Sequence, residues 1–121
     1  MPNMEIIQQL VKDVGLEGAQ KLIGMFQDDV IKRIQIIQDH VDQGGDLKDL
    51  HLQAHSLKGL CRTYGAIQGG EAAMELQAAC DSEDKNLIQE KALAALNIIP
   101  VDMKAAVNFM NTLASSAEHE K

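Results

Sequence analysis

Apolar side chains recur every three or four residues along most of this chain, which is the spacing of an amphipathic α-helix. A short stretch of this kind covers about residues 4–13, with Asn3 placed as its N-cap and Gly15 as its stop. A long one follows over about residues 17–43. Its apolar positions are Ala19, Leu22, Phe26, Val30, Ile34, Ile37 and Val41. The pattern therefore predicts a short N-terminal helix and then a long one.

Two further helices are predicted on either side of a tight turn at Tyr64-Gly65. The sequence "QGGD" ends the long helix, and Asp46 is placed to cap a helix over residues 47–63. The next helix is expected over about 66–82 and stops at "DSED". Its inward positions are Ala72, Ala73, Leu76, Ala79 and Cys80.

Pro100 lies inside the last apolar pattern, where it would break or kink a helix. A break would usually shift the spacing of the apolar positions after Pro100 relative to those before it. The spacing continues unchanged across Pro100, so we predict a single kinked helix. The residues with this spacing are Ile88, Ala92, Ala95, Ile99, Met103, Ala106, Met110 and Leu113. Residues 115–121 are expected to form a polar, frayed tail.

Short loops between long helices make neighbouring helices antiparallel. We therefore predict an all-α fold, an antiparallel up-down four-helix bundle with a short extra N-terminal helix. Residues 1–121 form a single domain, with the bundle over about 17–116. The composition agrees, because good helix formers dominate and only 2% of the residues are aromatic.

A net charge of −7 argues against nucleic acid or an anionic membrane as the default partner. No apolar run approaches the roughly 18 residues of a membrane span. Cys61 and Cys80 share no CxxC spacing, so we expect two reduced thiols and a cytoplasmic location. We also expect a monomer, because the pattern leaves no large exposed apolar stripe.

The stretch "HLQAHSLKGLCRTYGA", residues 51–66, carries the candidate chemistry. A helix drawn through it places a polar set opposite its apolar stripe, namely His51, His55, Lys58, Gly59 and Arg62. A solvated face has no need of a glycine, which costs about 1 kcal/mol relative to alanine in a helix interior. We infer that something approaches the backbone closely at Gly59.

Gln77 is expected beside His55. In an antiparallel hairpin centred near Ala66, His55 lies eleven residues before the centre and Gln77 eleven residues after it. The Gln77 carbonyl oxygen can then accept a hydrogen bond from Nδ1–H of His55, which leaves the ring Nε2 as a free nucleophile. Lys58 could supply positive charge to an anion held there. Gly59 has no side chain that would crowd an approaching partner. These roles indicate a site that carries a phosphoryl group on histidine.

"AHSLKG", then "YGA", then Leu76-Gln77 resembles the motif of the histidine phosphotransfer (HPt) domain family, A-H-x-L-K-G, G-A and L-E or L-Q. In that family the motif histidine accepts a phosphoryl group from a receiver-domain aspartate and passes it on. The resemblance implies that His55 is the phosphoacceptor, that Lys58 stabilises the phosphate and that Gly59 allows close docking. It implies that Gln77 orients the ring, and we give Arg62 a supporting role only.

The same resemblance implies the partners, which are response regulator receiver domains and a hybrid histidine kinase. It implies no cofactor of the chain's own, with Mg²⁺ on the partner receiver domain, and no ATP-dependent kinase activity. The chain departs from the family at position 69, where Gly69 replaces a frequent leucine. We expect Gly69 and Gly70 to loosen the start of their helix.

Two other functions stay open. One is a non-catalytic helical adaptor that binds a receiver domain without exchanging phosphate. The other is a metal-binding bundle built on His51 and His55, which lie four residues apart and could chelate from one helix face if other ligands joined them.

Overall fold

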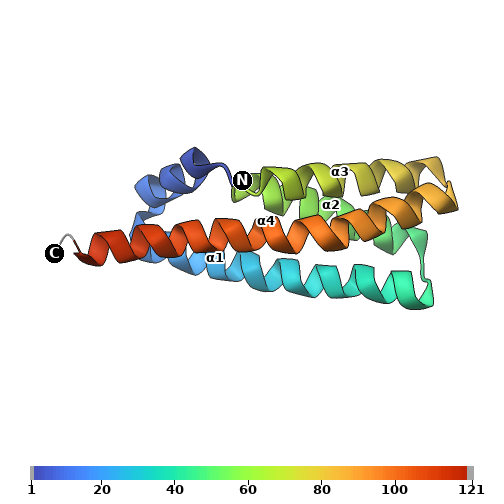
Figure 1. Cartoon of the computed structure of the whole chain (residues 1–121), viewed down its shortest axis with the longest axis horizontal. Helices are drawn as coiled ribbons and strands as arrows, with labels where there is room; N and C mark the ends of the chain where they lie inside the picture. The colour runs from blue at the N-terminus through green and yellow to red at the C-terminus, as the bar shows by residue number, and fades with distance from the viewer. Residues whose placement is uncertain (1, 120–121) are drawn as a thin grey trace.

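The chain folds as a bundle of four helices that run alternately up and down (Figure 1). The computed structural model describes residues 2–119, and the side chains of residues 2–116. The predicted all-α antiparallel bundle is confirmed. Its helices are α1 (Met4–Gln43), α2 (Leu47–Thr63), α3 (Ile67–Ser82) and α4 (Lys85–His119).

A kink at Gly15 separates the first turns of α1 from the long remainder, as the sequence predicts. Gly15 has φ 81° and ψ 165°, a conformation that glycine adopts without strain. The Asn3 side chain caps the first segment by accepting from the Ile6 N–H at 3.3 Å. The Asn3 N–H also donates to the Gly65 carbonyl at 2.7 Å, so this segment binds the turn between α2 and α3. A Cβ at Gly65 would lie only 2.8 Å from the Asn3 carbonyl oxygen, which explains the glycine.

The two glycines at the start of α3 are buried within the helix and allow α2 to pack closely against it. A Cβ at Gly69 would lie 3.2 Å from the Cys61 Sγ, and one at Gly70 would lie 3.0 Å from the Arg62 Cγ. The expectation that these glycines loosen the helix stays a prediction, although α3 is helical from Ile67 through Ser82. Their missing side chains make room for residues of α2.

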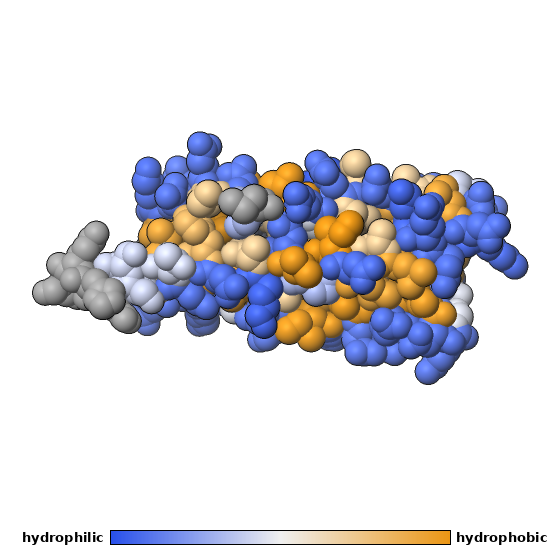
Figure 2. Space-filling model, viewed as in Figure 1, coloured by the Kyte–Doolittle hydropathy of each residue, from blue (hydrophilic) through white to orange (hydrophobic). Residues whose placement is uncertain are grey.

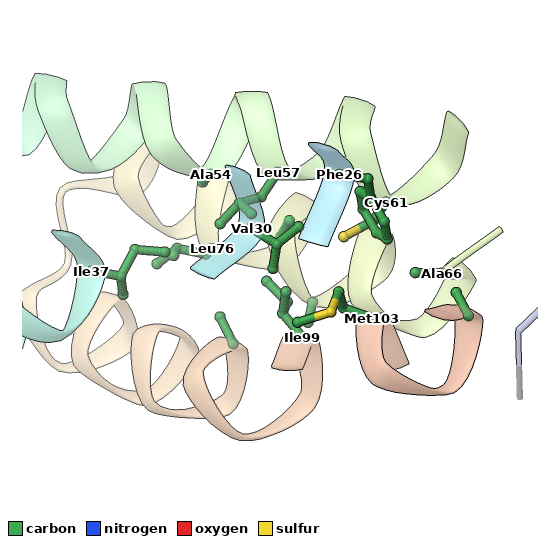
Figure 3. Packing of buried hydrophobic residues seen from close by; sticks show 14 of the residues in the cluster. Phe26, Val30, Ile37, Ala54, Leu57, Cys61, Ala66, Leu76, Ile99 and Met103 are labelled. Carbon is green, nitrogen blue, oxygen red and sulfur yellow. The ribbon is translucent and has the colours of Figure 1, made fainter. Parts of the chain in front are cut away.

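The last helix runs without a break through Pro100, which confirms the single predicted helix. Its inward residues pack against α1 and α3, and Figure 3 shows Ile99 and Met103 pointing into the core, with Ile99 toward Val30 of α1. The helix continues to His119, past the predicted start of the polar tail. Residues 120 and 121 of that tail lie outside the described part of the chain.

By length and composition, Lys85–Ser116 is apolar enough to cross a membrane, although the sequence analysis expected no such run. Both the inward and the outward face of α4 contribute apolar residues to this segment. Its inward face forms part of the bundle core. On its outward face, Leu93, Ile98 and Val101 are apolar although they are exposed to solvent.

Asp102 of α4 is a buried carboxylate that the sequence analysis did not single out. Only 3% of its surface is exposed, and its Oδ2 accepts a hydrogen bond from the Gly69 N–H at 2.8 Å. The residue at the N-cap position of α3, Ala66, makes no side-chain cap. Asp102 therefore satisfies a backbone donor in the first turn of α3 from a distant part of the chain.

Burial raises the pKa of the Cys61 thiol to about 12, and the Asp102 carboxylate adds to the shift. An unfolded chain releases this proton near the ordinary pKa of 9.0. Below pH 9 the folded and the unfolded chain both hold the thiol proton. Between about pH 9 and 12 only the folded chain holds it. The stability contributed by this group is therefore lost as pH rises. We expect the free energy of unfolding to fall with a slope of up to about 1.4 kcal/mol per pH unit from this thiol alone.

Urea denaturation at several pH values between 8 and 11 measures this slope. Cys61→Ala should flatten it, whereas Cys80→Ala should leave most of it in place. Equal slopes in wild type and Cys61→Ala would contradict the expectation.

Candidate functional site

His55 is exposed on α2, and Gln77 of α3 lies beside it as the turn position predicts. The Gln77 Nε2 atom is 3.3 Å from the His55 Nδ1 atom. The two residues lie eleven positions before and after Ala66. The hairpin register inferred from the turn is therefore confirmed.

The orientation of the Gln77 amide differs from the expected one. The amide nitrogen faces His55 Nδ1, and the amide oxygen is buried without a hydrogen-bond partner. An amide N–H donates to an unprotonated Nδ1 and so favours the tautomer with its proton on the ring Nε2. Turning the amide by 180° would present its oxygen to Nδ1–H and leave the ring Nε2 unprotonated. The two amide orientations thus select opposite tautomers of His55.

A second link between α2 and α3 lies one turn from the first. His51 Nε2 is 3.1 Å from Asp81 Oδ1, and these residues lie fifteen positions before and after Ala66. The described residues contain no group of three histidine, cysteine or carboxylate side chains placed to hold a metal ion. His51 thus has a polar partner on α3, and the described residues offer no third ligand for a metal shared with His55.

Gly59 lies on the exposed face of α2, one turn after His55. A Cβ built there would meet no other atom within 4 Å. Packing within the chain therefore gives no reason for glycine, although glycine destabilises a helix interior. This geometry supports the inference that the space is kept for a partner. Lys58 is half-buried on the same face, close enough along the helix to neighbour His55.

Arg62 points to α3 instead of His55. Its Nη2 atom is 3.4 Å from the Met74 Sδ, and its aliphatic stem covers Gly70. The residue lies seven positions after His55, which is about 10 Å along the helix. The structure therefore does not bring Arg62 to the histidine.

A polar network that the sequence pattern did not predict joins α1 to α2 behind the site. Arg33 Nη1 donates to Gln53 Oε1 at 2.9 Å, and Gln53 Nε2 donates to Asp49 Oδ1 at 3.2 Å. Asp29 also pairs with Arg33, at 3.0 Å. Gln53 is buried, so these bonds hold α2 in place two residues from His55.

Apolar surface flanks the histidine face on the side of α1. Leu52 is exposed three residues before His55, and Met25 is exposed on α1. A groove of about 480 Å³ between the helices is lined by Met25, Leu60 and Tyr64, among others. The site thus combines an exposed imidazole, a neighbouring cation, a bare stretch of backbone and an apolar margin, which suits docking of a folded partner that brings an anionic group.

Comparison with known proteins gives one finding. A family model described as "Hpt domain" matches residues 21–117 of the chain. The matched span contains His55, Lys58, Gly59 and Gln77. No curated protein matches the chain, and no solved structure does.

Proposed function

Because the chain belongs to the Hpt domain family, we propose that His55 accepts a phosphoryl group from a receiver-domain aspartate and passes it to a response regulator. The family implies phosphotransfer in two-component phosphorelays, and its members are phosphocarriers rather than kinases. The observation that carries the proposal is the exposed His55 ring beside Gln77, next to a glycine that no internal contact requires.

In the proposed step, the ring Nε2 attacks the phosphorus in line while the bond from phosphorus to the aspartate oxygen breaks. The electron pair of that bond leaves with the aspartate carboxylate. The proton stays on Nδ1, and the Gln77 oxygen can accept a hydrogen bond from Nδ1–H once the amide has turned. Catalysis of this kind is mainly positioning and electrostatics. The receiver domain would supply the bound Mg²⁺, and this chain would add no cofactor of its own.

The partners proposed for the chain are a hybrid histidine kinase, which supplies phosphate through its receiver domain, and a response regulator that takes it. The chain would act in the cytoplasm as a carrier without ATP-dependent kinase activity. The exposed apolar margin around Leu52 and the open backbone at Gly59 support docking of a folded domain there.

The test mixes the protein with a phosphorylated receiver domain and Mg²⁺ and looks for a phosphoryl adduct that is acid-labile and alkali-stable. We expect mass spectrometry to place the adduct on His55. A folded protein that forms a stoichiometric complex with a receiver domain, yet gains no phosphate from any of a panel of them, would instead favour the adaptor function.

Lys58→Ala is expected to slow phosphoryl acceptance, or to shorten the lifetime of the phosphohistidine, by roughly 5- to 30-fold. The lysine is the cation next to His55 on its face, and a charge-assisted bond to a phosphoryl oxygen is worth about 1–2 kcal/mol. Single-turnover transfer and adduct decay measure the two quantities. Lys48→Ala, an exposed lysine in the first turn of α2, is the matched control. Wild-type rate and lifetime in Lys58→Ala would contradict the assigned role.

A further inference from the structure

The outward face of α4 carries three exposed apolar side chains. Val101 is 71% exposed, Leu93 is 45% exposed and Ile98 is 39% exposed. Figure 2 shows hydrophobic side chains gathered over the middle of the face that α4 crosses in Figure 1. The expected monomer stays a prediction, and this face is where the structure offers a surface that could change it.

Leu93 and Val101 belong to a line of exposed positions three or four residues apart, which we call the α4 stripe. The stripe comprises Glu90, Leu93, Asn97, Val101, Lys104 and Asn108. It contains one acidic and one basic residue, so it is neutral in a chain whose net charge is −7. Two copies of the chain would repel each other over most of their surface but not here.

We propose that the α4 stripe binds a second copy of this chain, with the two α4 helices antiparallel and crossing at Asn97. A two-fold axis at that point places positions equidistant from Asn97 opposite each other. Glu90 lies seven residues before Asn97 and Lys104 seven residues after it. Leu93 and Val101 lie four residues before and after it. Each Glu90 then faces a Lys104, and each Leu93 packs beside a Val101.

The charge pattern favours this arrangement over the parallel one. In a parallel pair, Glu90 would face Glu90 and Lys104 would face Lys104, and like charges across a helix pair are unfavourable. The antiparallel pair gains two opposite-charge contacts from the same four residues. At the centre, the two Asn97 side chains can hydrogen-bond to each other and so set the alignment.

The stripe is short, which limits the affinity. From Glu90 to Asn108 it extends about 27 Å. A contact of that length is at the low end of specific interfaces, and we expect a dissociation constant on the order of 100 µM. Helix α4 packs on α1 and α3, whereas His55 is exposed on α2. The dimer therefore leaves both histidines accessible and does not depend on the proposed phosphotransfer.

Analytical ultracentrifugation of the full chain, from about 5 µM to about 1 mM, tests the proposal. We expect a monomer–dimer equilibrium that Val101→Glu weakens by more than about tenfold, because the change buries a carboxylate against the partner's Leu93 in both symmetric contacts. Met25→Glu is the control, since Met25 is similarly exposed at 59% but lies on α1. Circular dichroism confirms that both variants are folded.

Charge reversal tests the antiparallel geometry directly. Glu90→Lys and Lys104→Glu should each weaken self-association by about fivefold, because each places like charges in both contacts. Mixing the two variants should restore association, as a heterodimer, to at least the wild-type level. In a parallel pair the wild type already has like charges in both contacts, so neither single variant would weaken self-association, and that result would contradict the antiparallel geometry.

Three results would overturn the proposal. The first is a monomer at every concentration, and the second is a dimer that Val101→Glu leaves unchanged. The third is a monomer that co-sediments with phosphatidylcholine vesicles and loses this binding in Val101→Glu, which would assign the stripe to a membrane surface.

Discussion

His55→Gln is expected to abolish phosphoryl acceptance while leaving the helical content and the thermal midpoint unchanged. Glutamine has a similar reach but no nucleophilic nitrogen, so the loss should exceed about 1,000-fold. The ring is exposed, and its contact with Gln77 is a single bond at the surface, so the fold loses little. The measurement is phosphate incorporation from a phosphorylated receiver domain, alongside circular dichroism.

His51→Gln is the matched control for this experiment. It lies one turn away on the same face of α2 and loses only its pairing with Asp81. We expect it to accept phosphate at close to the wild-type rate. Wild-type acceptance by His55→Gln, or equal loss in both variants, would contradict the assignment of His55 as the phosphoacceptor.

Asp102→Ala is expected to lower the free energy of unfolding by about 2–4 kcal/mol, the largest stability effect we predict for a polar residue. The change leaves the buried Gly69 N–H without its acceptor, which costs about 1–3 kcal/mol, and opens a small cavity beside it. Urea denaturation of the variant and the wild type gives the difference.

Asp102→Asn separates the lost hydrogen bond from the lost volume. Its amide oxygen can still accept from Gly69, so we expect it to cost less than Asp102→Ala. Asp28→Ala, an exposed carboxylate on α1, should change the stability by less than about 0.5 kcal/mol. If Asp102→Ala is as mild as Asp28→Ala, the Asp102 bond is not a major support of α3.

The fold was predictable because its signals are local. Apolar spacing marks each helix, and Asp46 and Gly65 mark the ends of α2, so its predicted bounds match the observed ones. The contact between His55 and Gln77 was predictable too, because a short turn fixes which positions are level in a helical hairpin.

The features that sequence reasoning missed depend on residues far apart in the chain. The bond from Asp102 to Gly69 spans 33 positions, and neither residue alone signals it. Gly69 looked like a weak point of a helix, whereas it makes room for Cys61. The Gln77 amide orientation was not predictable either, since both ends of an amide can bond to an imidazole and the surrounding contacts choose between them.

The contact between Asn3 and Gly65 also constrains the order in which the chain can fold during synthesis. Asn3 leaves the ribosome first, but its backbone partner follows 62 positions later. The Gly69 N–H at the start of α3 has its acceptor only after Asp102 has been translated, which is later still. Helices α1 and α2 are translated earlier, but the arrangement that brings Gln77 to His55 gains its full support only when most of α4, which packs on α3, has been translated.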